Sequence, residues 1–191
     1  MRGFSLIEMM AVVAIVLIIS AISVVSLQAP LQAGRVTNAY NITLGAMRQA
    51  RDISIAQRQT YYATFSNAAV PNTITITQGG TGTVVSTFQL PTDVAFVAQT
   101  GLPGVGPDNF GAGGTAIDFD QGVGGGAKSV IYFYPDGTGQ DVNGNINNGV
   151  IYIARSGQLY STHAITVWGA TGRLRGWRLY NNAGTNYWRQ M

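Results

Sequence analysis

The chain has 191 residues, of which 10% are charged and 25 are glycine, and its formal net charge is +3. This length allows one modest domain in addition to a membrane segment, and the composition is more typical of a loop-rich β domain than of a helical bundle. The sequence has no cysteine, which excludes disulfide bonds and thiol catalysis.

The first element in chain order is an apolar segment. Residues 9–27 carry no charge, and a helix of this length is about 28 Å long, close to the hydrocarbon thickness of a bilayer. Glu8 stands at the start of this run, where a carboxylate in hydrocarbon costs about 2.5–3.5 kcal/mol on insertion scales. The segment is therefore a candidate membrane helix, and its single acid needs an explanation of its own.

Two simpler interpretations of this segment explain less of it. A cleaved secretory signal has a shorter apolar core followed by small residues, whereas Ser20, Ala21 and Ser23 lie inside the run. A plain membrane anchor explains the length of the run but not the placement of Glu8.

The residues around Glu8 resemble a known processing site. Gly3-Phe4-Ser5-Leu6-Ile7-Glu8, preceded by a charged leader and followed by an apolar helix, is similar to the class III leader junction of type IV pilins and type II secretion pseudopilins. The resemblance implies that a prepilin peptidase cleaves between Gly3 and Phe4 and methylates the new amino terminus. It also implies that Glu8 neutralises the amino terminus of a neighbouring subunit during filament assembly, which makes a buried carboxylate tolerable.

Two features depart from the pattern of that family. The leader, Met1-Arg2-Gly3, is very short, and Val25 stands where the family commonly has proline. The second departure favours a minor subunit over a major one.

The membrane topology also follows from the resemblance. It implies a single-pass protein of the bacterial inner membrane with a cytoplasmic amino terminus, a periplasmic body and a place at the filament tip after assembly. The arginines at positions 35, 48, 51 and 58 follow the span, and a simple positive-inside count would place that side in the cytoplasm. We follow the resemblance on this point.

Residues 28–58 are expected to continue the helix. Val36, Tyr40, Leu44 and Met47 recur at helical spacing and form one apolar stripe, which predicts packing on the protein's own domain. Pro30 would weaken the helix locally.

From residue 61 the apolar period changes to two, which predicts β-strands. The expected strands are 60–66, 73–78, 83–90, 94–98, 115–119, 128–134, 149–154, 163–168, 172–180 and 186–189. The fold class is therefore α+β, with a long N-terminal helix on a mostly antiparallel, pilin-like body. The expected divisions are a leader (1–3), a transmembrane half-helix (4–27), an amphipathic half-helix (28–58) and a periplasmic β domain (59–191).

Several loops carry polar residues. Residues 101–126 are rich in glycine and predict a long surface loop. Asp136 and Asp141 lie in one Asn- and Gly-rich stretch and are weak candidates for Ca²⁺ ligands. The spacing matches no EF-hand, and such clusters are typical of turns, so no metal site is expected. Asp118 and Asp120 are expected on one solvated strand face.

Enzymatic activity is not expected from this sequence. His163 is the only histidine, a metal cluster or catalytic triad would have to be built around it, and no G-x-S-x-G is present. A half-exposed strand histidine is the favoured interpretation. No cofactor is expected.

Three stretches of the body extend the resemblance. Residues 50–56 (ARDISIA), 131–137 (IYFYPDG) and 172–175 (GRLR) look like segments of the pseudopilin-H and FimT-like minor pilin group. In the FimT-like group the G-R-x-R element is implicated in DNA capture for uptake.

The tail is the most basic part of the chain. Residues 142–191 contain no acid. Arg173 and Arg175 are expected on one strand face, and together with Arg178 and Trp177 they are candidates for binding DNA by phosphate contacts and base stacking. The alternative is a solvated basic edge strand whose arginines pack over aromatic rings.

Two functions follow from these patterns. The first is a minor pseudopilin of a type II secretion system, whose partners are other subunits at a filament tip, the prepilin peptidase and inner-membrane lipid. The second is a FimT-like minor pilin that binds DNA through its C-terminal arginines. The sequence does not choose between secretion and DNA uptake.

Overall fold

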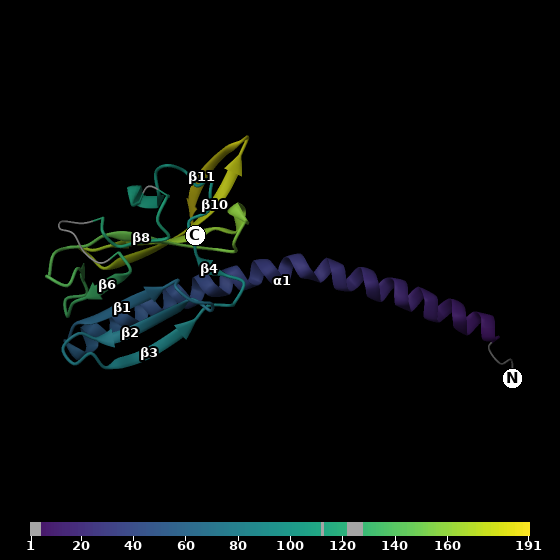
Figure 1. Cartoon of the computed structure of the whole chain (residues 1–191), viewed down its shortest axis with the longest axis horizontal. Coiled ribbons are helices and arrows are strands. Elements are labelled where there is room, and N and C mark those ends of the chain that lie inside the picture. Colours follow the sequence, from purple (N-terminus) through teal and green to yellow (C-terminus); the bar gives the residue numbers. More distant parts are fainter. Residues whose placement is uncertain (1–4, 112, 122–127) are drawn as a thin grey trace. The chain divides into compact units, whose positions relative to one another are not determined.

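The computed structural model describes residues 5–111, 113–121 and 128–191. The chain divides into two compact units, Met1–Gly34 and Arg35–Met191, and a single helix, α1 (Leu6–Gln57), contributes to both. Each unit is described by itself (Figure 1).

The first unit consists of the amino-terminal part of α1. Its large apolar side chains from Leu6 to Ile22 are exposed. The helix α1 is long and apolar enough to cross a membrane, because an 18-residue window within it has a mean hydropathy of 2.9 and none of that window is buried. The hydroxyls of Ser20 and Ser23 donate to the carbonyls of Val16 and Ile19 at 2.7 and 2.8 Å. These bonds within the helix satisfy polar groups that lipid could not.

The part of α1 from Arg35 to Gln57 belongs to the second unit. The predicted stripe is confirmed, because Val36, Tyr40, Leu44 and Met47 are all buried, with Met47 at 0% exposure. Pro30 does not end α1, which continues to Gln57.

One sheet contains the first three strands after the helix. Within the described residues its order is β3-β2-β1-β6-β7, and every pairing is antiparallel. Its members are β1 (Tyr61–Ser66), β2 (Thr73–Gln78), β3 (Val84–Gln89), β6 (Val130–Phe133) and β7 (Gly139–Gln140). The alternating burial of β1 and β6 sends one side of each strand to the core.

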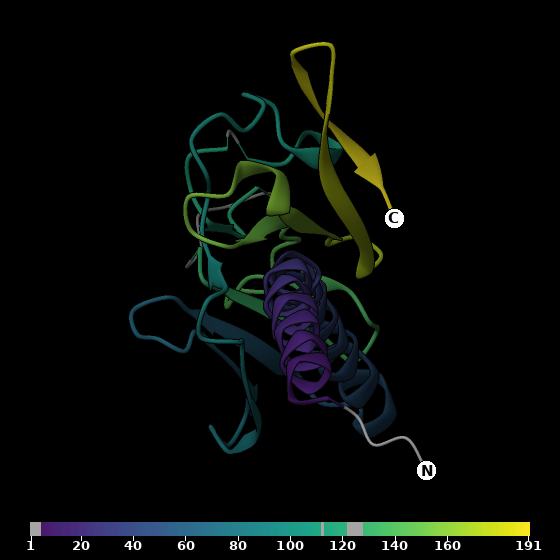
Figure 2. The ribbon, with the colours of Figure 1, turned by 90° about the vertical axis from the view of Figure 1, so that its right-hand side faces the viewer.

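The second sheet contains the carboxy-terminal strands. Among the described residues its order is β11-β10-β9-β8-β4, and β5 also pairs with β8. Its members are β4 (Ala95–Phe96), β5 (Ile117–Asp118), β8 (Gly149–Ala154), β9 (His163–Trp168), β10 (Arg173–Asn182) and β11 (Thr185–Gln190). The hairpin of β10 and β11 extends beyond the rest of the body in both views (Figures 1 and 2).

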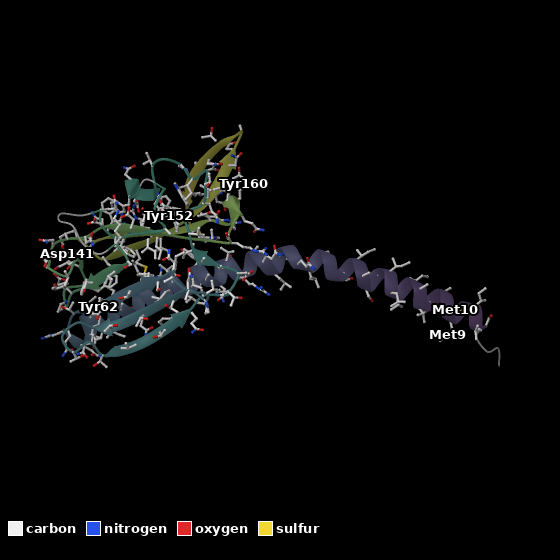
Figure 3. The ribbon with its side chains drawn as sticks, in the orientation of Figure 1. Met9, Met10, Tyr62, Asp141, Tyr152 and Tyr160 are labelled. Carbon is white, nitrogen blue, oxygen red and sulfur yellow. The ribbon has the colours of Figure 1, made fainter. Side chains whose placement is uncertain are left out.

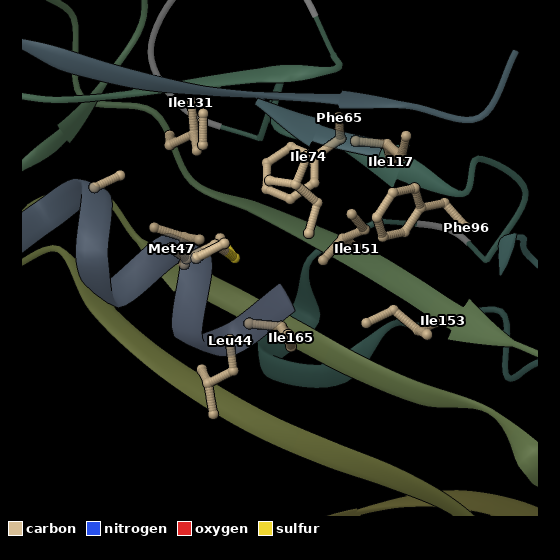
Figure 4. Packing of buried hydrophobic residues seen from close by; sticks show 14 of the residues in the cluster. Leu44, Met47, Phe65, Ile74, Phe96, Ile117, Ile131, Ile151, Ile153 and Ile165 are labelled. Carbon is tan, nitrogen blue, oxygen red and sulfur yellow. The ribbon is translucent and has the colours of Figure 1, made fainter. Parts of the chain in front are cut away.

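The main core lies between the helix and the inner faces of both sheets. Leu44 and Met47 of α1 belong to one buried cluster with Phe65, Ile74 and Ile131 of the first sheet. Ile151 and Ile153 of β8 and Ile165 of β9 belong to the same cluster (Figure 4). This burial fixes the α+β arrangement expected from the sequence, a long helix packed on antiparallel sheets.

A second, smaller core covers the opposite face of the β8-β9-β10 sheet. Phe110, Val150, Tyr152 and Ala164 form its buried part, with Trp177 and Trp188 packed against it. Phe110 comes from the glycine-rich stretch that was expected to be a surface loop. That expectation was wrong for residues 106, 107 and 110, which are buried because the segment packs on this face of the sheet. Residues 112 and 122–126 of the stretch lie outside the described residues.

Two expectations about polar residues were also wrong. Asp118 is 6% exposed rather than solvated. It lies in β5, which pairs with β8, and both residues of β5 are buried. Gln121 donates to one Asp118 oxygen at 2.8 Å, and the ammonium of Lys128 lies 3.8 Å from the other. These partners offset the cost of burying the carboxylate.

His163 is buried at 3% exposure rather than half-exposed. The ring of Tyr40 from α1 lies 5.3 Å from the imidazole centroid to centroid, and Nδ1–H donates to the Ser161 carbonyl at 2.9 Å. Burial lowers the pKa of His163 below its ordinary value of 6.5, and the charge of Arg178 lowers it further, against the raising effect of the Ser161 carbonyl.

This lowered pKa makes stability depend on pH. Between the ordinary pKa and the lower folded-state pKa, the unfolded chain binds the proton and the folded chain does not, so the free energy of unfolding should fall as pH drops below about 6.5. His163→Gln should remove this contribution. Denaturant unfolding at about pH 8 and about pH 5 measures it, and equal pH dependence in the two proteins would contradict the assignment.

Candidate functional site

The processing and assembly residues lie at the start of α1. Gly3 and Phe4, the predicted cleavage pair, lie outside the described residues. Glu8 is exposed in the first turn of α1, and the backbone N–H groups of Glu8 and Met9 donate to the Ser5 carbonyl at 3.1 and 3.2 Å. An acid in the first turn is also favoured by the helix dipole, and Ser5 with Glu8 has the spacing of a capping box.

The three body stretches that carry the resemblance meet around Arg51. Its Nε donates to the Gly137 carbonyl at 3.1 Å, and its Nη2 donates to the Thr171 carbonyl at 3.3 Å. Ser54 of the same helix donates to the Tyr134 carbonyl at 3.1 Å. Segments that are far apart in sequence are therefore joined by one guanidinium.

The close approach of these segments requires a glycine at position 172. Its φ is +59°, and a Cβ atom there would overlap the Gly137 carbonyl oxygen and lie 2.7 Å from Arg51 Nε. Only glycine allows this close approach in a left-handed conformation. The glycine of the G-R-x-R element therefore has a structural task in this chain.

A groove opens beside Gly172 on the face of the sheet that carries the smaller core. It has a volume of about 310 Å³ and is lined by Trp168, Ala170, Thr171, Arg173 and Arg175. Trp168 is 37% exposed, and the Arg175 guanidinium carbon lies 5.7 Å from its ring centroid. Arg173 and Arg175 thus line one groove with an accessible aromatic ring.

The two arginines of the groove differ in what they contact. Arg175 Nη1 donates to Asp108 Oδ1 at 2.7 Å, and the Asp108 side chain is 5% exposed. Arg173 is exposed, and the part of the chain that the structure describes gives its guanidinium no ion pair.

A smaller hollow adjoins the groove. It has a volume of about 230 Å³ and shares Thr171 and Arg173 with the groove, while Arg48, Arg51 and Asp52 of α1 line its other side. Arg48 is exposed. The basic surface therefore runs from β10 onto the helix.

The other two tail candidates are placed differently. Trp177 is half-buried in the smaller core, and its Nε1–H donates to Thr166 Oγ1 at 3.0 Å. Arg178 lies on the opposite strand face, near His163, with its guanidinium 5.5 Å from the Tyr180 ring centroid. The three candidate arginines are therefore not gathered on one surface.

The alternative of a basic edge strand was wrong. β10 pairs with β9 on one side and β11 on the other, so it is an inner strand. The sequence prediction for residues 186–189 correctly marked the extra strand, and the turn at Ala183-Gly184 returns the chain to pair with β10. The expected packing of arginines over aromatic rings is confirmed for Arg175, Arg178 and Arg189.

The two calcium candidates act in turns. Asp141 (Figure 3) is buried and accepts the N–H groups of Asn143 and Asn145 at 2.8 and 2.9 Å. The Asn145 side chain and these N–H groups hold the pKa of Asp141 below its usual value. Asp136 accepts from Thr138, which lowers its pKa as well. Among the described residues no three acidic, histidine or cysteine side chains come together as a metal site.

These features define a class of protein. A long amino-terminal helix, apolar with one acid in its first turn, continues into a helix packed on antiparallel sheets, and this is an arrangement consistent with a pilin-like fold. Residues 1–24 match the family model described as the prokaryotic N-terminal methylation motif. The matched residues are the amino-terminal part of the chain, and the motif indicates a pilin- or pseudopilin-like amino terminus with an apolar helix suited to membrane anchoring. No curated protein and no solved structure matches the chain.

Proposed function

We propose that this chain is a minor pseudopilin of a type II secretion system. It is cleaved between Gly3 and Phe4, methylated on Phe4, held in the inner membrane by the apolar part of α1 with the amino terminus cytoplasmic and the body periplasmic, and assembled with other subunits at a filament tip. The observation that carries the proposal is the lone Glu8 at the start of an exposed apolar helix inside the matched motif. The three stretches on which the resemblance to the pseudopilin-H and FimT-like group rests meet at residues 51, 137 and 172.

To test assembly, the protein is expressed together with its peptidase and filament system, and two measurements are made. Mass spectrometry of the amino-terminal peptide should find a methylated Phe4, and immunoblotting should find the chain in the sheared filament fraction. An amino terminus at Met1, or a chain that stays entirely in the membrane fraction, would contradict the proposal.

DNA capture is the second candidate, and the groove favours it. Arg173 has an exposed guanidinium beside the accessible ring of Trp168. Arginines interleaved with an aromatic ring bind phosphates and stack on bases. This candidate assigns the contacts to Arg173 and Arg175, and it leaves out Arg178 because that side chain lies on the other face.

Arg173→Ala should weaken DNA binding and Arg178→Ala should not. Removing one phosphate contact lowers affinity by roughly three- to tenfold at physiological salt and reduces the salt slope of log K by about 0.9. Fluorescence anisotropy of a labelled duplex with the full-length chain in a non-ionic detergent measures both. The two variants lose the same charge, so equal losses would mean a general charge effect and no site in the groove.

A further inference from the structure

Asp108 lies at the centre of an unusual loop. It is the only charged residue between Asp93 and Asp118, and it lies in the short helix η1 (Pro107–Asn109). Asp108 and Asn109 have φ values of +57° and +62°, a conformation that non-glycine residues adopt at a cost in free energy. The loop is therefore held by contacts that outweigh this strain.

The contacts come from Arg175, which lines the groove, and from the buried Thr166 on the neighbouring strand. The Asp108 carboxylate accepts from Arg175 Nη1 at 2.7 Å and from Thr166 Oγ1 at 2.5 Å. Thr166 in turn accepts the indole N–H of Trp177. Arg175 and Thr166 lie opposite each other on β10 and β9, so two neighbouring strands present donors to one anion.

The Asp108 carboxylate leaves one N–H donor of Arg175 unused. Each of its oxygens takes one donor, and Arg175 Nε is buried with no hydrogen-bond partner among the described residues. A guanidinium binds two parallel acceptors when the anion is placed for it. A phosphate has enough oxygens to accept from Nε, from Nη1 and from the Thr166 hydroxyl together.

We propose that Asp108 is a built-in competitor for the anion position at Arg175, and that a DNA phosphate replaces its carboxylate when the loop of residues 104–111 moves aside. The inference rests on DNA capture, the second candidate function above. The exchange would let Arg175 bind a DNA phosphate beside Trp168, in addition to the phosphate contact of Arg173. It would thereby set the affinity of the groove for DNA. Without the exchange, the charge of Arg175 is neutralised by Asp108 and contributes little to DNA binding.

The test compares the wild type with Asp108→Asn in the full-length chain, in non-ionic detergent, with a labelled duplex over a range of salt concentrations. Asparagine keeps the shape and removes the charge. Asp108→Asn should bind about five- to tenfold more tightly, with a salt slope steeper by about 0.9, because one more cation meets the phosphates. Circular dichroism and thermal unfolding establish that the variant is folded.

Two controls separate a local exchange from a change in net charge. Asp93→Asn also removes an acid paired with two arginines, Arg35 and Arg155, outside the groove, and it should leave DNA affinity nearly unchanged. Adding Arg175→Ala to Asp108→Asn should abolish the gain. A gain of the same size in Asp93→Asn, or one that survives Arg175→Ala, would overturn the proposal.

The outcomes distinguish this inference from the function on which it rests. If the wild type binds DNA and Asp108→Asn binds no more tightly, the competitor role fails and DNA capture stands. If neither protein shows salt-dependent binding, both fail. Binding by Asp108→Asn alone would be the strongest support, because the anion position would then be open only when the carboxylate charge is gone.

Discussion

Gly172→Ala is expected to destabilise the body by about 4 kcal/mol, which lowers Tm by roughly 8–16 °C for a domain of this size. Two costs add at this position. The left-handed conformation at φ +59° costs any other residue about 1 kcal/mol. The new Cβ also overlaps the Gly137 carbonyl, which must move away from Arg51 Nε and lose its hydrogen bond.

Gly184→Ala is the matched control for the conformational cost alone. Gly184 has φ +87°, and no heavy atom lies within 4 Å of the position of its Cβ. It should lose only about 1 kcal/mol, or roughly 2–4 °C. Thermal unfolding followed by circular dichroism compares the two variants. Equal losses would show that the approach of residues 137 and 172 contributes nothing beyond the strained φ.

This comparison also bears on the meaning of the G-R-x-R element. Its glycine is explained by packing, and one of its arginines is engaged by Asp108. Arg173 is the member of the element that faces solvent. A loss of DNA binding in a glycine variant would therefore report on folding, whereas the arginine variants report on the surface.

Local patterns were sufficient for most of the secondary structure. Strands such as 73–78 and 149–154 were predicted with the bounds that the structure has, because Val, Ile and Thr runs end at turn residues. β7 was missed because a strand of two residues has no period to detect. η1 was missed because its left-handed residues, Asp108 and Asn109, are held by contacts with distant strands.

The site could be predicted only in part, for two different reasons. His163 is covered by the ring of Tyr40 from α1, which is far away in sequence. The residues around His163 therefore give no indication that it is buried. The sequence alone could have predicted that Arg178 lies apart from Arg173 and Arg175, because residues an odd number apart on a strand lie on opposite faces. The partnership of Asp108 with Arg175 joins residues 67 apart, and nothing near either residue indicates it.

Glu8→Gln is expected to be cleaved and methylated normally, yet to enter filaments roughly 100-fold less than the wild type. Burying an ion pair and then removing one partner costs about 3–5 kcal/mol, and about 2.8 kcal/mol corresponds to a 100-fold change. In the proposed assembly, the amino group of a neighbouring Phe4 is the partner left uncompensated. The sheared filament fraction, divided by the total of processed chain, measures the loss.

The choice of glutamine separates two roles for the same residue. Glu8 lies in the first turn of α1, three residues after Ser5, and both glutamate and glutamine satisfy a capping box there. If Glu8 only caps the helix, Glu8→Gln should assemble as well as the wild type and Glu8→Ala should fail. If its charge pairs with a neighbouring amino terminus, both variants should fail to a similar degree while both are cleaved. The two roles differ only in whether the side chain must carry a charge. Normal assembly of Glu8→Gln would therefore rule out the charge pairing with a neighbouring subunit and leave helix capping as the role of Glu8.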